Sequence, residues 1–415
     1  MTDTDTAITR AHHDEWARVV AALTGRFGDL DIAEDAAAEA FAVAVARWPS
    51  DGIPPNPGAW LTTTAHRKAI DRIRRENKRD DKHQQAFMIH DNSADPPDVI
   101  ADDRLRLLFT CAHPALSVDA RVALTLRMIG GLTVREISRA LLVSESATAR
   151  RITRAKTKIA AARIPYRVPT AADLPARVDG VLAVLYLIFN EGYLATGPDT
   201  DPIRRDLTTE AVRLIRLVHE LLPDDGEVAG LLALMLLIDA RRSTRVSADG
   251  ELVPLADQDR GRWDRHMINE GHALVRELLA AGFPPGRYQI LAAINAVHTS
   301  APDVRDTDWA QVAALYDLLV RVDPSPIVEL NRAVAVAELD GPEVALAIVD
   351  RLDLNGYHAF HATRADLLRR LGCTTEARDA YNTAIDLAGN TAEVTHLTRR
   401  RNQLASPPPR PDAPA

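Results

Sequence analysis

Wherever apolar residues follow a regular pattern in this 415-residue chain, they recur at the spacing of amphipathic α-helices. No stretch alternates apolar and polar residues for long enough to predict a strand. The longest apolar runs cover 181–189 and 231–238, and both are shorter than the roughly 20 residues that a membrane-spanning helix needs. The pattern therefore predicts an all-α protein whose apolar helices are buried and which does not enter a membrane.

Composition divides the chain into segments, and its length favours two or three domains over one core. Helical segments cover 10–80 and 101–163, and a longer apolar helical region covers 170–400. A polar stretch with a Pro-Pro pair predicts a linker at 81–100. The proline-rich end, 401–415, is predicted to be a disordered tail because its prolines cannot join a helix.

A faint repeat runs through the last helical region. Ala313, Ala345 and Ala377 recur at a spacing of 32, each inside an apolar helical segment. Chain breaks at 323–326, 340–342 and 371–373 separate these segments. The pattern favours a solenoid of tetratricopeptide-like helix pairs, and a non-repetitive bundle of equally long helices is the alternative.

Charge is distributed unevenly. The net charge of −8 would disfavour nucleic acid if it were spread evenly, but basic residues gather at 67–82 and 121–167. Phosphate groups interact with the local charge of a surface, so DNA binding remains compatible with these two basic runs. For either run alone, the alternative is a helix face that is simply exposed to solvent.

Motifs for catalysis, metals and cofactors are absent from the sequence. Cys111 and Cys373 are far apart and in no CxxC pair, and the histidines show no HExxH spacing. No phosphate-binding GxxxxGK[ST] loop or GxSxG elbow occurs. We expect a cytoplasmic protein that is not an enzyme and that holds no metal or cofactor.

The segment 130–163 has the pattern of a helix-turn-helix. Thr133 and Glu136 form a capping box that opens one helix, and Ser144 can cap the next. In that second helix an apolar face, spaced as Thr148, Ile152 and Ile159, predicts a buried side. Its opposite face of arginines and hydroxyls suits the major groove of DNA.

Residues 132–160 (LTVREISRALLVSESATARRITRAKTKIA) resemble the sigma-4 domain of extracytoplasmic-function sigma factors. Two positions depart from the family pattern: Leu142 replaces the turn glycine, and Ala147-Thr148 replaces a Thr-Val pair. The resemblance implies that this helix reads the upstream promoter element, with these candidate contacts: Ser144, Ser146, Arg150, Arg151, Thr153, Arg154 and Lys158.

The first helical segment resembles the sigma-2 domain of the same family. Residues 29–49 resemble the helix that docks on the polymerase clamp, with Asp35 and Glu39 as candidate contacts and Phe41 and Trp48 packing inward. Residues 56–79 resemble the promoter-melting helix, in which Trp60 is either a core aromatic or a support for an unstacked base. The candidate melting residues are Asn56, Trp60, Arg67, Lys68, Arg72 and Arg75.

The third helical region resembles the C-terminal extensions fused to one branch of this family, above all at 181–196. Within that segment, Asn190 and Glu191 either bind a ligand, face the sigma domains, or simply mark a helix end that Gly192 breaks.

Together these resemblances imply a sigma factor that binds core RNA polymerase and directs it to specific promoters. The extension would modulate activity through a protein partner or an intramolecular contact. The alternative is a helix-turn-helix regulator with a sensing domain, which would need neither a clamp helix nor a melting helix.

Overall fold

The computed structural model describes residues 3–79, 99–141, 143–170, 172–194, 203–247 and 251–404. Within these ranges all regular structure is helical, apart from an isolated β-bridge between Val246 and Leu252. The all-α prediction is confirmed. The predicted linker falls almost wholly on 80–98, outside the described residues, as do Leu142 and most of the predicted tail, 405–415. No described helix combines the length and apolar composition that crossing a bilayer requires.

The chain forms two compact units, Met1–Ile188 and Phe189–Ala415. The boundary falls inside helix α8 (Leu174–Tyr193), later than the start of the extension predicted near residue 170. The first part of α8 belongs to the first unit, where the Arg177 guanidinium donates a hydrogen bond to the backbone carbonyl of Phe109. Sequence composition could not reveal this contact.

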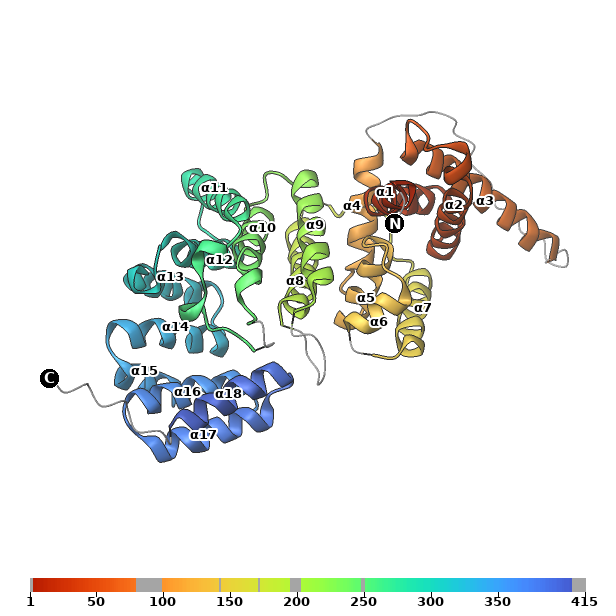
Figure 1. The fold of residues 1–415 in the computed structure, drawn as a ribbon. Coiled ribbons are helices and arrows are strands. Elements are labelled where there is room, and N and C mark those ends of the chain that lie inside the picture. The colour runs from red at the N-terminus through yellow and green to blue at the C-terminus, as the bar shows by residue number, and fades with distance from the viewer. Residues whose placement is uncertain are drawn as a thin grey trace. The chain divides into compact units, whose positions relative to one another are not determined.

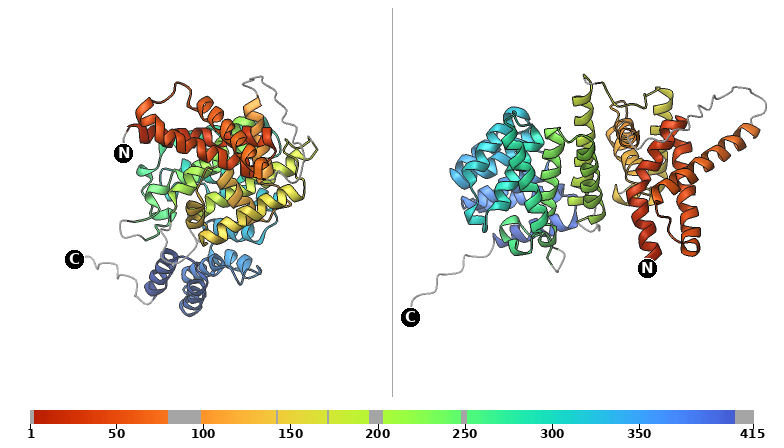
Figure 2. Two further views of the ribbon diagram at one scale, coloured as in Figure 1. Left: turned by 90° about the vertical axis from the view of Figure 1, so that its right-hand side faces the viewer. Right: turned by 90° about the horizontal axis from the view of Figure 1, so that it is seen from above.

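The first unit begins with two groups of helices (Figure 1). In the first group α1, α2 and α3 all contact one another, and the far end of α3 projects beyond the other two (Figures 1 and 2). Trp16, Phe41 and Trp48 are buried in this group, as predicted for the last two. The helices are α1 (Asp3–Phe27), α2 (Leu30–Asp51), α3 (Pro57–Arg79), α4 (Val99–Cys111), α5 (Val118–Met128), α6 (Val134–Ala140) and α7 (Glu145–Ala161).

The second unit is a succession of helices that mostly pack on their neighbours in sequence, except that α10 and α12 pack above all on each other (Figures 1 and 2). Helix α10 is apolar on nearly every side and is buried accordingly, which explains the run at 231–238. The helices are α9 (Arg205–Leu221), α10 (Gly226–Asp239), α11 (Arg265–Ala281), α12 (Arg287–Ser300), α13 (Trp309–Val322), α14 (Pro326–Leu339), α15 (Pro342–Val349), α16 (His358–Arg370), α17 (Thr374–Leu387) and α18 (Thr391–Gln403). Short 3₁₀ turns lie at 242–244, 255–257, 260–262 and 304–306.

The repeat seen in the sequence coincides with helix pairs. Ala313, Ala345 and Ala377 lie in α13, α15 and α17, and each of these helices is followed by a partner helix. Ala345 and Ala377 are fully buried, because only a small side chain fits where the helices approach closely. Helix α18 continues to Gln403, three residues into the predicted tail, and Arg401 there bonds to Asn382 on α17.

Candidate nucleic-acid interface

The helix-turn-helix is built by the local signals that its sequence carries. The Thr133 side chain accepts from the backbone N–H of Glu136, and the Glu136 carboxylate accepts from that of Thr133, so the predicted capping box is present. Ser144 caps α7 by accepting from the Ala147 N–H at 3.2 Å. The buried side of α7 includes Thr148 and Ile152, as its spacing predicts.

The predicted contacts to the upstream element gather on the other side of α7. Arg150 and Arg154 are exposed, and each guanidinium donates from Nε to a backbone carbonyl one turn earlier, at 3.2 and 3.3 Å. Those bonds leave the outer nitrogens of both side chains for a base edge or a phosphate. Arg151 differs, because it is half-buried and pairs with Asp119 at 3.3 Å. The remaining candidates, Ser144, Ser146, Thr153 and Lys158, are exposed.

Helix α3 carries the second set of candidates. Asn56 accepts from the Ala59 N–H at 3.0 Å and so caps the helix, while Leu61, Ala65 and Ala69 are fully buried beneath it. This burial turns the basic residues outward. Arg67 and Arg75 are exposed on that outer surface.

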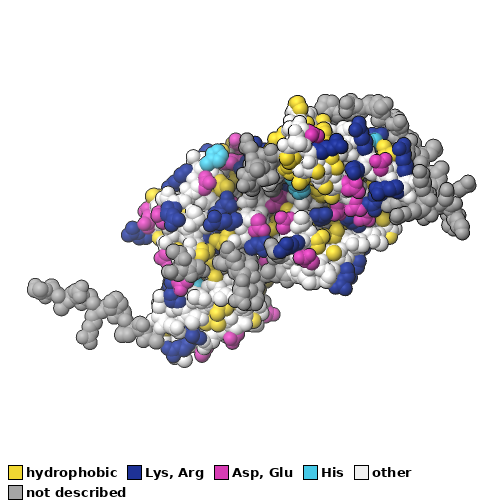
Figure 3. All heavy atoms as spheres, turned by 45° about the vertical axis from the view of Figure 1, so that its right-hand side comes forward, with side chains coloured by type: hydrophobic (Ala, Val, Ile, Leu, Met, Phe, Trp, Pro, Cys, Tyr) yellow, Lys and Arg dark blue, Asp and Glu magenta, His cyan; other side chains and the backbone are white. Residues whose placement is uncertain are grey.

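The other two basic candidates on α3, Lys68 and Arg72, are paired with α2. Arg72 forms an ion pair with Asp35, and Lys68 lies 3.3 Å from Glu39. These acids are the candidate polymerase contacts, and their side chains are 59% and 45% exposed, so both remain accessible to a partner. On the face drawn in Figure 3, basic and acidic side chains are likewise interspersed.

Trp60 is half-buried and lies edge-on to Trp48 with the ring centroids 5.5 Å apart. Trp48 itself is 2% exposed, so Trp60 covers the end of the core and keeps one part of its ring at the surface. The structure therefore places Trp60 where both of its predicted roles, core aromatic and support for a base, are compatible with its position.

Sequence reasoning missed a buried ionic cluster that joins α7 to α2. Lys156 of α7 is 8% exposed and contacts Asp31 and Glu34 of α2, with its Nζ 2.7 Å from an Asp31 carboxylate oxygen. Glu34 also accepts from Arg127 at 2.6 Å. The signal was present, since position 156 lies one turn after Ile152 and therefore borders the buried side of the helix.

The segment around Gly192 lies at a helix end, one of the alternatives that the sequence left open. Helix α8 continues through Gly192 and ends one residue later, at Tyr193. A Cβ at that position would lie 2.6 Å from the Thr208 backbone nitrogen and 2.9 Å from the Arg204 carbonyl oxygen. Glycine is needed here because the start of α9 approaches too closely for any side chain. No group of three or more metal-ligating side chains occurs among the described residues.

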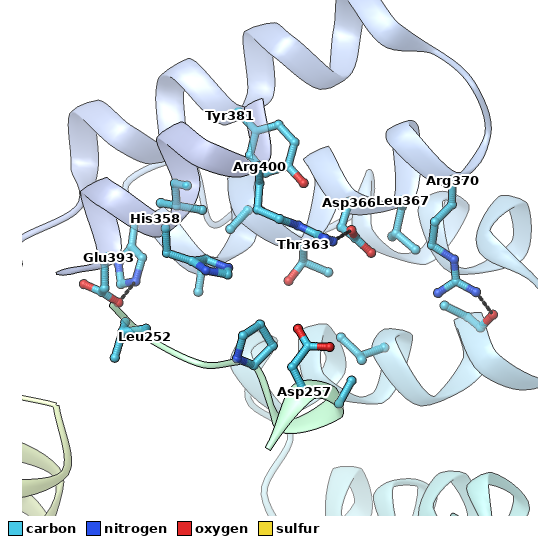
Figure 4. Close-up of a pocket in the computed structure, with 18 of the residues that line it drawn as sticks. Leu252, Asp257, His358, Thr363, Asp366, Leu367, Arg370, Tyr381, Glu393 and Arg400 are labelled. Carbon is cyan, nitrogen blue, oxygen red and sulfur yellow. Dashed lines mark hydrogen bonds and ion pairs between the residues drawn. The ribbon is translucent and has the colours of Figure 1, made fainter. Parts of the chain in front are cut away.

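A cavity of about 550 Å³ lies in the second unit, between the segment at 252–257 and helices α16 and α18 (Figure 4). Two of its ion pairs join α16 to α18: Arg400 with Asp366 at 2.7 Å, and His358 with Glu393 at 3.0 Å. The imidazole of His358 donates to the Glu393 carboxylate, and this hydrogen bond raises the pKa of His358. Arg370 pairs with Glu338 at 2.7 Å in the same lining, and Asp257 adds a further carboxylate.

Three parts of the chain match known protein families. Residues 10–79 match the family described as Sigma-70 region 2, residues 106–159 match Sigma-70 region 4, and residues 177–279 match a family of unknown function, DUF6596.

Individual relatives extend this picture. The chain is 42% identical to an uncharacterized protein of Rhizobium meliloti (strain 1021), over 98% of each chain. It is 31% identical to the probable ECF RNA polymerase sigma factor SigI of Mycobacterium tuberculosis, over 46% of this chain and 68% of that protein. A crystal structure of yeast Tom70 aligns with 97% of this chain and 85% of its own, at 11% identity and a TM-score of 0.38, too low to establish a shared fold.

Proposed function

The chain belongs to the extracytoplasmic-function family of sigma-70 factors, and on that premise we propose that it binds core RNA polymerase and directs it to specific promoters. The proposal rests on the observation that the first unit has two distinct surfaces. Helix α7 exposes arginines and hydroxyls over a buried apolar side, and α2 and α3 supply an acidic surface beside a basic one.

Each surface has a distinct task in this proposal. Arg150 and Arg154 of α7 grip the upstream promoter element, because arginine can bond two acceptors on a guanine edge. Arg67 and Arg75 of α3 follow the phosphate backbone, where positive charge supplies affinity without sequence preference. Asp35 and Glu39 of α2 contact the polymerase. None of these tasks requires a cofactor.

Reconstituted transcription tests the proposal. Purified protein and core polymerase are mixed with a library of genomic fragments, and the transcripts are sequenced. We expect initiation from a small set of promoters that core polymerase alone does not use. An operator-type complex that forms without polymerase, with no transcript from any fragment, would show that the chain is an ordinary helix-turn-helix regulator.

A pair of variants tests the polymerase contact separately. Asp35→Asn combined with Glu39→Gln removes both exposed carboxylates of the proposed contact, so binding to core polymerase should weaken at least several-fold. Glu145→Gln, an equally conservative change of an exposed acid on α7, is the matched control and should leave core binding unchanged. Equal binding by all three proteins would place the polymerase contact elsewhere.

The second unit modulates this activity in our proposal. It is larger than the two promoter-binding helix groups together and has core clusters of its own, such as the one built around Ala345 and Phe360. Stacked helix pairs present an extended surface that engages another protein or another segment. A covalently attached domain acts at an effective concentration of roughly millimolar, so weak contacts suffice.

A further inference from the structure

A cavity of about 720 Å³ lies in the second unit, between the end of α12, helices α13 and α14, and the segment at 252–257. It borders the cavity between α16 and α18, since Ala256, Val334 and Glu338 line both, and it is the larger of the two. Sites for small organic molecules have volumes of roughly 300–1,000 Å³. This cavity is therefore large enough to hold such a molecule.

Most of the lining is apolar. Trp309 and Tyr316 lie about two turns apart on α13 with Val312 between them, so all three are on one side of the helix. Val334 of α14 and Leu255 add to the apolar surface, and Val334 is 40% exposed. An aromatic or aliphatic body in the cavity would remove this surface from water, which favours binding.

Positive charge acts on the end of the cavity at α12. His298 lines the cavity there, and the guanidinium of the buried Arg260 donates to the backbone carbonyls of His298 and Ala301, at 2.7 Å to the latter. Burial, and then the guanidinium groups of Arg241 and Arg260, lower the pKa of His298 to about 4, so its imidazole is uncharged at neutral pH. An uncharged imidazole offers one hydrogen-bond donor and one acceptor.

Carboxylates near this end offset the positive charge only in part. Burial and the neighbouring Arg241 lower the pKa of Arg260, and Asp303 and Asp306 oppose this without reversing it. Arg305 lines the cavity as well; its side chain is 85% exposed and pairs with Asp303 at 2.8 Å. This end of the cavity is therefore positive, and it favours a negatively charged group.

Helix α14 presents a side without net charge. Asn331, Val334 and Glu338 are spaced at i, i+3 and i+7, so they form one row that lines the cavity. Glu338 pairs with Arg370 at 2.7 Å, which offsets its charge. The exposed amide of Asn331 can both donate and accept a hydrogen bond. An anion is therefore favoured at the end of α12 rather than along α14.

We infer that this cavity binds a small apolar organic anion, with its aromatic or aliphatic body against Trp309, Tyr316 and Val334 and its acidic group at the end of α12. The inference concerns the second unit alone and does not rest on the proposed function. Carboxylates and sulfonates share the chemistry that this end recognises, because both are anions that accept hydrogen bonds from guanidinium and imidazole groups.

The first test asks whether the cavity holds a small molecule. Full-length protein is titrated with two probes that fluoresce more strongly in an apolar site: anilinonaphthalene sulfonate, and the uncharged phenylnaphthylamine, which has the same aromatic body. We expect one saturable site per chain for the sulfonate probe. Asn331→Trp fills the cavity from an exposed position and should weaken binding of both probes at least roughly tenfold.

Asn269→Trp is the matched control, because it makes the same change at an exposed site of α11 outside the cavity, and it should leave both affinities unchanged. Circular dichroism and thermal unfolding of each variant check that the second unit remains folded. If the sulfonate probe showed no saturable binding, or if Asn331→Trp and Asn269→Trp bound the probes equally well, the site would be overturned.

The second test asks whether the site prefers an anion. Arg305→Gln removes an exposed charge from the lining, so it should weaken binding of the sulfonate probe roughly threefold and leave the uncharged probe unaffected. Arg378→Gln removes an exposed arginine of α17 outside the cavity and should change neither affinity. Equal effects of Arg305→Gln on the two probes, or no effect on either, would overturn the preference for an anion.

Discussion

At the scale of single residues, the arginines of α7 illustrate how a sequence motif becomes a specific surface. Arg150, Arg151 and Arg154 look alike in the sequence, but the fold separates them. Arg151 turns toward α5 and pairs with Asp119, whereas the other two remain exposed on the reading side. We therefore expect Arg150 and Arg154, rather than Arg151, to contact bases.

Arg150→Ala should weaken binding to the chain's own promoter by roughly 1–3 kcal/mol and relax sequence preference at one upstream position, because a bidentate contact to a base is lost. Binding of a promoter duplex, with each upstream base pair varied in turn, measures both effects. Arg135→Ala on α6 is the comparison, since the first helix of such a motif crosses the backbone. It should weaken all sequences alike. An Arg150→Ala protein with unchanged preference at every position would remove Arg150 from the reading surface.

We expect His298 to make the stability of the second unit depend on pH. Burial, together with the nearby guanidinium groups of Arg241 and Arg260, lowers the pKa of His298 to about 4. Between about pH 6.5 and pH 4 the unfolded chain protonates this histidine while the folded unit resists, so folding stability falls as the pH falls. The loss approaches about 2–3 kcal/mol near pH 4.

Thermal unfolding at pH 7.5 and pH 5 tests the prediction. His298→Gln should unfold at a temperature that changes less with pH than that of the unmodified protein, because one group that takes up a proton on unfolding is gone. His266→Gln changes an exposed histidine and should keep the original pH dependence. Identical pH dependence in all three proteins would contradict the assignment to His298.

At the scale of secondary structure, the N-terminal caps of two neighbouring helices, α5 and α6, can be compared. Thr133 caps α6 through a complete capping box, whereas Ser117, at the equivalent position of α5, makes no capping hydrogen bond with its side chain. Thr133→Ala should destabilise the first unit by about 1 kcal/mol, and Ser117→Ala by much less. Urea unfolding measures the free energy of unfolding of both variants. Equal decreases in this free energy would mean that the capping box at Thr133 adds no stability.

Two glycines of α8 offer a second comparison between sites on one helix. Gly192→Ala should destabilise the second unit by roughly 1–3 kcal/mol, because the new Cβ would collide with backbone atoms of Arg204 and Thr208 at the start of α9. Gly180 has no atom closer than 3.8 Å to an added Cβ, so Gly180→Ala should be neutral or stabilising by up to about 1 kcal/mol. Urea unfolding measures the change in the free energy of unfolding for both variants. If both alanines were tolerated equally, the close approach at Gly192 would be contradicted.

At the scale of the whole molecule, the second unit should alter transcription. Truncation after Arg167 should change transcript yield at least several-fold, in one direction or the other, because it removes the domain that we propose to be regulatory. Transcript yield and core polymerase binding are compared with those of the full-length chain. A truncated protein identical to the full-length one in both would show that the second unit is passive.

This truncation needs a control, because it also removes the part of α8 that packs in the first unit. Arg177→Ala deletes the hydrogen bond to the Phe109 carbonyl while leaving the second unit attached. If Arg177→Ala reproduces the effect of truncation, the loss of α8 packing explains it. If it does not, the effect belongs to the second unit.

The sequence by itself determined the features that depend on residues close together in the chain. The helical class, the capping box at Thr133, the cap at Ser144 and the buried face around Ile152 all follow from spacing within one or two helical turns, where geometry is nearly invariant.

Only the tertiary structure decided the features that depend on which surfaces meet. Local spacing places Lys156 beside the buried side of α7, but its partner Glu34 is 122 positions away, so the sequence does not show what this lysine pairs with. Gly192 has the appearance of a helix breaker in the sequence, but the fold uses its missing side chain to admit α9. The physical reason is the same for both residues. Packing brings together segments that are distant in the sequence, and the local propensity of one segment does not depend on which other segment packs against it.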